Sequence, residues 1–251
     1  MGYRPAINPF GYVKLKYASK KLKNDREFVL GVINSDGGNL LKYASKELKN
    51  DREIVLKSVS DDGMALQFAS EELKNDREIV LAAINSGGGD LLKYASEELK
   101  NDREIVLAAI NSGGGDPLKY VSEELKNDKE FMLEAIKLSS YYLRYTSEEL
   151  RGDREIIFQA VNLNGYSLRY SSEELRSDRE VVLTAVKSGG KALKYASKEL
   201  RADREIVLEA VKSCYKALKF ASEKLKADRE IVLEAVKSCG YYLKYASEEL
   251  R

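Results

Sequence analysis

The stretch from Leu92 to Leu107 reads Leu-Lys-Tyr-Ala-Ser-Glu-Glu-Leu-Lys-Asn-Asp-Arg-Glu-Ile-Val-Leu, and variants of it recur along the chain. Its Tyr-Ala-Ser-x-x-Leu part appears in ten versions, with successive aromatic residues 25 or 26 positions apart. A fixed period of this length indicates a tandem array of small units, each unable to bury its apolar face alone. The aromatic positions are Tyr17, Tyr43, Phe68, Tyr94, Tyr120, Tyr145, Tyr170, Tyr195, Phe220 and Tyr245.

Each period contains two segments with helical periodicity. In the first segment Leu91, Leu92 and Leu99 share one face with the recurring aromatic, which predicts a short amphipathic helix. Asp102 then lies where a side-chain oxygen caps a second helix, whose apolar face falls within residues 105–110. Because the aromatic completes the apolar stripe of the first helix, we expect it to pack in the core and not to stack on nucleobases.

Glycine recurs five residues before the aromatic, where it predicts a left-handed end to the second helix. These glycines are Gly38, Gly63, Gly89, Gly115, Gly165, Gly190 and Gly240. Helices this short do not persist alone in water, so stacking of neighbouring units has to stabilise them. The sequence therefore predicts an all-α fold, an α-solenoid of about ten short helix-turn-helix repeats. We expect residues 1–11 to be an irregular lead-in and residues 12–251 to form a single tandem-repeat domain.

The unbroken motif from Leu92 to Leu107 resembles a family of short tandem helical repeats classified as a domain of unknown function. That family is met mainly in protists, large DNA viruses and some bacteria. The resemblance covers the chain from about Tyr12 to Arg251 and implies a helical repeat fold. It implies no catalytic residue, cofactor or substrate.

The chain offers little for catalysis. It contains no histidine, which removes the usual general base and the commonest zinc ligand. The Asp-Arg-Glu string, with one Lys variant, occurs nine times at structural spacing, whereas an active site normally occurs once. We therefore expect its aspartate to cap a helix and its arginine to reach a carboxylate or carbonyl of the adjacent unit. We predict no enzyme activity, no cofactor and no metal site.

The sequence also bears on the compartment of the protein. We find no basic-then-apolar leader and no run of eighteen apolar residues, so neither a signal peptide nor a membrane span is expected. Cys214 and Cys239 occupy the same position in adjacent units, which stacking would hold too far apart for a disulfide. Two free thiols indicate an intracellular protein, cytoplasmic by default.

The varied positions of the repeat are the candidate binding residues, because stacking does not require them. Four residues before the aromatic, the chain changes from acidic to aromatic and basic along the array, as a surface fitted to an extended partner would. Tyrosine is common at binding hot spots, so exposed tyrosines here predict a docking site; packing onto neighbouring helices is the open alternative. The candidates are Tyr141, Tyr142, Tyr166, Lys191, Lys216, Tyr241 and Tyr242.

Two functions from different classes fit this pattern. The first is a non-enzymatic scaffold or adaptor that binds proteins along one solenoid face, or a structural subunit of a larger complex. The alternative is nucleic-acid binding with tyrosine stacking, through Lys187, Lys191, Lys194, Lys198, Lys212, Lys216 and Lys219. Residues 181–230 carry a net charge of +5, but residues 54–155 carry −8 and would repel phosphate. The charge distribution therefore favours a protein partner.

Overall fold

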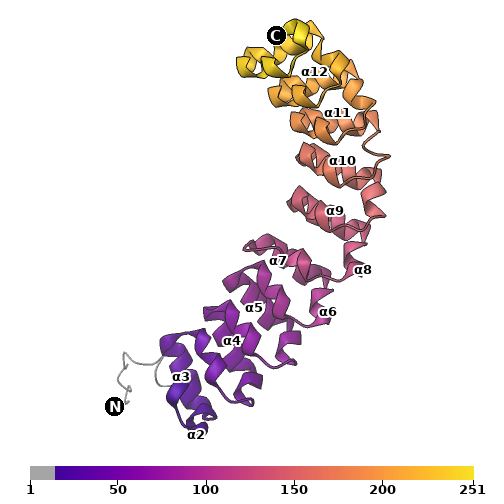
Figure 1. Ribbon diagram of the computed structural model, residues 1–251. Helices are drawn as coiled ribbons and strands as arrows, with labels where there is room; N and C mark the ends of the chain where they lie inside the picture. Colours follow the sequence, from indigo (N-terminus) through magenta and orange to yellow (C-terminus); the bar gives the residue numbers. More distant parts are fainter. Residues whose placement is uncertain (1–14) are drawn as a thin grey trace. The chain divides into compact units, whose positions relative to one another are not determined.

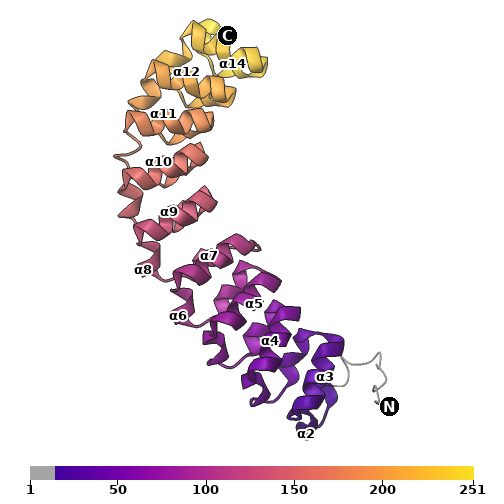
Figure 2. The same cartoon turned by 180° about the vertical axis from the view of Figure 1, so that it is seen from behind.

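The computed structural model describes residues 15–251 of the protein. Every regular element in this range is an α-helix or a 3₁₀-helix, and the range contains no strand (Figures 1 and 2). The predicted all-α repeat fold is confirmed. The irregular lead-in expected at residues 1–11 lies outside the described residues.

Long α-helices, short α-helical turns and 3₁₀-helices alternate along the chain. The α-helices are α2 (Lys20–Lys23), α3 (Arg26–Asp36), α4 (Arg52–Asp61), α5 (Arg77–Gly87), α6 (Glu97–Lys100), α7 (Arg103–Ser112), α8 (Glu123–Lys126), α9 (Lys129–Leu138), α10 (Arg154–Leu163), α11 (Arg179–Ser188), α12 (Arg204–Ser213), α13 (Glu223–Lys226) and α14 (Arg229–Ser238). The 3₁₀-helices are η1 (Gly38–Tyr43), η2 (Leu48–Asn50), η3 (Gly63–Phe68), η4 (Leu73–Asn75), η5 (Gly89–Tyr94), η6 (Pro117–Lys119), η7 (Ser140–Tyr145), η8 (Leu150–Gly152), η9 (Gly165–Tyr170), η10 (Gly190–Tyr195), η11 (Leu200–Ala202), η12 (Tyr215–Phe220), η13 (Gly240–Tyr245) and η14 (Glu248–Leu250).

The second helix of each unit forms as the sequence predicts. In α7 the carboxylate of Asp102 accepts a hydrogen bond of 3.0 Å from the amide of Ile105, so Asp102 is the N-cap. Ile105, Val106 and Ala109 are buried on the face that packs against neighbouring elements. The equivalent aspartates cap α3, α4, α5, α9, α10, α11, α12 and α14.

The first helix of the unit differs from its prediction, because it is broken into two pieces. η5 ends at Tyr94, the backbone is extended at Ala95, and Ser96 caps the single turn of α6. The amide of Ser96 donates a hydrogen bond of 3.0 Å to the carbonyl oxygen of Lys74 in the preceding repeat. In a continuous helix that amide would bond internally, so the break frees a backbone donor to link two repeats.

The recurring glycines also serve a purpose other than the predicted one. Gly63, Gly89, Gly165 and Gly190 do not have a positive φ; each begins a 3₁₀-helix. A Cβ atom at any of them would collide with the carbonyl oxygen of an alanine in the next repeat's long helix. The left-handed cap was therefore the wrong explanation for these four, and close approach between repeats is the right one. Gly115 does have a positive φ, of 136°.

The described chain groups into two compact units, one ending at Ser122 and the other beginning at Glu123. Within the first unit α4, α5 and α7 lie side by side, and within the second α9, α10, α11 and α12 do (Figures 1 and 2). Each unit is therefore a stack of repeats whose core lies between successive helices. The prediction that residues 12–251 form one domain stays a prediction.

A charged clamp joins successive repeats at the start of the long helices. Arg154 contacts Asp178 through Nε at 3.1 Å and Glu180 through Nη2 at 2.5 Å, both in the next repeat. The other clamps are Arg26 with Asp51 and Glu53, Arg52 with Asp76 and Glu78, Arg77 with Asp102 and Glu104, Lys129 with Asp153 and Glu155, Arg179 with Asp203 and Glu205, and Arg204 with Asp228 and Glu230. The predicted link from this arginine to the adjacent unit is confirmed.

Two of the clamp aspartates, Asp51 and Asp178, each cap a helix and pair with an arginine, and both have a lowered pKa. Burial raises the pKa of the Asp178 carboxyl, but hydrogen bonds from the Val181 amide and from Arg154 outweigh it, so the pKa lies below its usual value. The balance is similar at Asp51, where Arg26 and the Ile54 amide donate. These carboxylates are therefore ionised parts of the repeat framework.

Candidate partner-binding site

The candidate residues lie at the start of successive 3₁₀-helices in the second unit. Tyr141 in η7, Tyr166 in η9 and Tyr241 in η13 occupy the same repeat position, and 44%, 36% and 68% of their surface is exposed. Lys191 and Lys216 occupy that position in η10 and η12 and are half-buried. The structure thus places these five residues at one position in successive repeats, outside the packed core.

The two remaining candidates, Tyr142 and Tyr242, point into the stack. Tyr142 is only 8% exposed, and it contacts Tyr141 edge to face at 5.9 Å between ring centroids. It lies three residues before the recurring aromatic, a position that is buried in most repeats. Tyr242 has this same position and is half-buried, with Tyr215 at 4.7 Å. Including Tyr142 in an exposed surface was therefore wrong.

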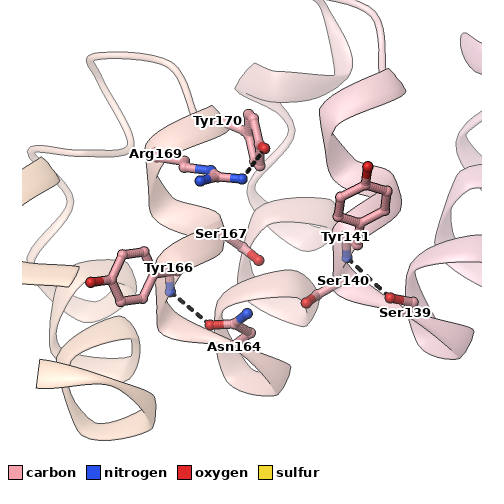
Figure 3. A pocket seen from close by; sticks show the side chains of 8 residues that line it. All are labelled: Ser139, Ser140, Tyr141, Asn164, Tyr166, Ser167, Arg169 and Tyr170. Atoms are coloured by element: carbon pink, nitrogen blue, oxygen red, sulfur yellow. Dashed lines mark hydrogen bonds between the residues drawn. The ribbon is translucent and has the colours of Figure 1, made fainter. Parts of the chain in front are cut away.

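Tyr141 and Tyr166 line one cavity of about 340 Å³ between two repeats. Figure 3 shows the two rings on opposite sides of the hollow, with the side chains of Ser140 and Ser167 between them. Arg169 closes another side, where it donates a hydrogen bond to the hydroxyl of Tyr170. We call this cavity and its two exposed tyrosines the tyrosine surface.

Local capping sets the direction of the two tyrosines. The amide of Tyr166 donates a hydrogen bond of 3.1 Å to Oδ1 of Asn164, and the amide of Tyr141 donates one of 3.3 Å to Oγ of Ser139. Each bond fixes the first turn of a 3₁₀-helix, where the side chain of the donating tyrosine lies outside the core. The ring of Tyr166 also meets the ring of Tyr195 at 6.0 Å. The wall of the cavity is therefore held in place before any partner binds.

The recurring aromatic residues are not core residues, contrary to the prediction. From Tyr43 to Tyr245 they are half-buried, and Tyr17 is exposed. In most repeats the preceding lysine or arginine lies over the ring; Arg169 is 4.4 Å from the ring centroid of Tyr170 and Lys219 is 4.7 Å from that of Phe220. Each of these rings therefore lies at the edge of the apolar core, half-buried and beside a cation.

Other kinds of site find no support in the part of the chain that the structure describes. Residues 15–251 contain no group of three or more acidic or cysteine side chains placed to hold a metal ion. No helix in the same range is long and apolar enough to cross a membrane. Cys214 and Cys239 are free thiols, as predicted.

Comparison with known proteins identifies the repeat. The family model described as Domain of unknown function (DUF4116) matches residues 7–49, 33–73, 51–88, 86–116, 114–151, 153–201 and 203–251. The chain belongs to the DUF4116 family. The resemblance seen in the recurring motif is thus confirmed. No curated protein and no solved structure matches the chain.

Two positions of the DUF4116 repeat change from lysine to arginine in several repeats of the second unit, a signal that our sequence reasoning missed. Arg144 and Arg169 precede the aromatic, where Lys42 and Lys93 lie in the first unit. Six residues after the aromatic the arginines are Arg151, Arg176, Arg201 and Arg251. Since arginine and lysine differ little in helix propensity, stacking gives no reason for this change.

The arginines line further hollows beside the tyrosine surface. A cavity of about 440 Å³ includes Arg151, Arg169, Tyr170 and Arg176, and one of about 390 Å³ includes Arg176, Tyr195 and Arg201. The first shares Arg169 and Tyr170 with the tyrosine surface, and the two share Arg176. We call these two cavities the arginine groove. It continues the tyrosine surface across neighbouring DUF4116 repeats.

Proposed function

We propose that the protein is a non-catalytic repeat scaffold that binds a partner protein through the tyrosine surface of its second unit. One observation carries the proposal. Tyr141 and Tyr166 are exposed and share a cavity, although residues at the inward positions of the same repeats, such as Leu143 and Leu168, are fully buried. The repeat framework thus presents side chains that its own stability does not require.

Tyrosine suits this purpose on physical grounds. It offers a large contact area with few rotatable bonds, so ordering it on binding costs little entropy, and its hydroxyl gives a hydrogen bond at the rim. Binding energy in protein interfaces is concentrated in a few such anchors. Local caps hold both backbones, so the free protein already has the geometry that a partner would meet.

Affinity capture with matched variants tests the proposal. Tagged wild-type protein and the double variant Tyr141→Ser, Tyr166→Ser are used to capture proteins from the native cell, with quantification by mass spectrometry. Met64→Ser is the control, because Met64 is 41% exposed at the same repeat position in the first unit. We expect a protein that the wild type and Met64→Ser retain and the double variant loses by about tenfold or more, the effect of removing a hot spot.

The structural effect of the substitutions is checked by circular dichroism and thermal unfolding, which we expect to stay the same because both side chains are exposed. Equal retention by wild type and double variant would contradict the proposal. Nucleic acid co-purifying with the wild type and absent from the double variant would instead favour the nucleic-acid alternative.

A further inference from the structure

The arginine groove differs from its counterpart in the first unit in how its cations are paired. The first unit has an equivalent hollow that includes Lys74, Lys93 and Lys100. There Lys74 pairs with Glu71 at 2.7 Å and Lys100 with Glu97 at 2.8 Å. Both lysines at this repeat position are thus neutralised by their own repeats.

In the arginine groove this pairing is missing although the glutamates are present; where the second unit keeps lysine at this position, as at Lys126, the pair with the glutamate forms. Arg151 and Arg176 lie three residues after Glu148 and Glu173, the spacing of the lysine pairs, but neither forms an ion pair within the described residues. They donate instead to carbonyl oxygens seven residues earlier in the chain, Arg176 to that of Arg169 at 2.7 Å. The two guanidinium groups therefore lie in the groove bonded to carbonyl oxygens and not paired with a carboxylate.

The cations that precede the aromatic add to this charge. Arg144 and Arg169 are exposed, contact tyrosine rings and tyrosine hydroxyls, and form no ion pair within residues 15–251. An aromatic face holds a guanidinium in position without neutralising it. By contrast, the clamp arginines such as Arg154 each have two carboxylates. The clamp cations thus have carboxylate partners, whereas the described residues offer no ion pair to the arginines of this second set, which are Arg144, Arg151, Arg169 and Arg176.

We propose that the arginine groove binds the carboxylates of an extended acidic segment of the partner protein, an inference that rests on the proposed function. Arginine presents a planar fork of donors that matches a carboxylate, which explains arginine in place of lysine. Stacked helices lie about 8–10 Å apart. An extended chain advances about 3.3 Å per residue, so an acidic residue at every third position meets each repeat in turn.

The groove walls favour a peptide over a nucleic acid. Glu148 and Glu173 line one cavity and Glu173 and Glu199 the other. A nucleic acid carries a phosphate at every nucleotide and would meet these glutamates, whereas a peptide places a neutral or basic residue beside them. An apolar residue of the same segment then occupies the cavity of the tyrosine surface, which shares Arg169 and Tyr170 with the groove.

Fluorescence anisotropy at physiological salt tests this partner. The probe is a labelled mixture of peptides of about ten residues with glutamate at every third position, enough to span the groove. The same mixture with glutamine and a single-stranded oligouridine of similar extended length are the comparison probes. The test variant is Arg169→Gln, Arg176→Gln in the full chain, and the matched control is Lys93→Gln, Lys100→Gln at the same repeat positions of the first unit.

We expect the glutamate mixture to bind the wild type more tightly than the glutamine mixture or the RNA. The arginine variant should lose about tenfold or more of this affinity, as expected for charged hydrogen bonds, and the lysine variant should lose none. Arg169→Lys, Arg176→Lys should lose part of it, because lysine keeps the charge without the fork. Thermal unfolding of each variant confirms that it folds.

Equal binding of the glutamate and glutamine mixtures, or an equal loss in the arginine and lysine variants, would overturn the inference. Tighter binding of oligouridine that depends on the arginines would replace the peptide with a nucleic acid. Partner capture that depends on Tyr141 and Tyr166 would still stand after a failed peptide titration, so the proposed function and the acidic partner fail separately.

Discussion

Gly190→Ala tests whether the recurring glycine is required by close packing between repeats. A Cβ atom at Gly190 would overlap the carbonyl oxygen of Ala210 and would lie 2.8 Å from the amide nitrogen of Cys214 and 3.0 Å from its Cβ. Ordinary contacts of a Cβ atom begin near 3.4 Å. The colliding atoms are mainly backbone of the next long helix, so they move only if that helix shifts. Overpacking of this kind costs about 1–3 kcal/mol, and we expect about 3 kcal/mol because the obstacle is backbone.

Urea unfolding followed by circular dichroism, with linear extrapolation to water, measures this cost. Gly152→Ala is the matched control, since nothing lies within 4 Å of the Cβ position and Gly152 does not have a positive φ. That substitution should be neutral or stabilise the protein by up to about 1 kcal/mol, through the smaller entropy of the unfolded chain. If both variants unfold at the same urea concentration, the glycine does not mark a close approach.

Three further perturbations test the repeat framework by the same unfolding assay. Asp178→Ala should cost about 1 kcal/mol because it removes a helix cap, whereas Asp178→Asn should cost less because the amide oxygen still accepts; equal losses would contradict capping. Since hydrogen bonds hold the pKa of Asp51 and Asp178 below the unfolded value of about 4, the stability they contribute is complete above pH 4 and is lost as the pH falls further. A stability that is constant from pH 5 to about pH 2 would refute this. Ser58→Ala should change stability by less than about 0.5 kcal/mol or raise it, because Oγ only donates to the Ile54 carbonyl and alanine is the better helix former; a large loss would show a further role for the hydroxyl.

The repeat period predicted the fold because each unit repeats the same signals. Asp102 before a run of apolar residues predicted the cap and the long helix correctly. The break at Ala95 was not predictable from periodicity, because Leu92 and Leu99 keep helical spacing across it. That break depends on the Ser96 amide bonding to another repeat, a tertiary contact that no single unit encodes.

The candidate site was predictable in part. The exposure of Tyr141, Tyr166 and Tyr241 was predictable, because other repeats have no tyrosine at this position and stacking therefore does not require one. Tyr142 was wrongly predicted to be exposed, because tyrosine also fits a position that points into the stack. The arginine groove was readable as a change from lysine to arginine at fixed repeat positions. The missing ion pair of Arg176 was not predictable from the sequence, because Glu173 and Arg176 have the same spacing as the glutamate–lysine pairs that do form.

Photo-crosslinking from position 166 tests the central claim, that a partner protein docks on the tyrosine surface, most directly. A benzophenone amino acid replaces Tyr166 in one protein and Met64 in another, and each is irradiated in the native cell. Both positions are exposed and have the same place in the repeat. We predict that position 166 gives a discrete protein adduct which position 64 does not give. The same adducts from both positions, or an adduct to nucleic acid at position 166, would contradict the account.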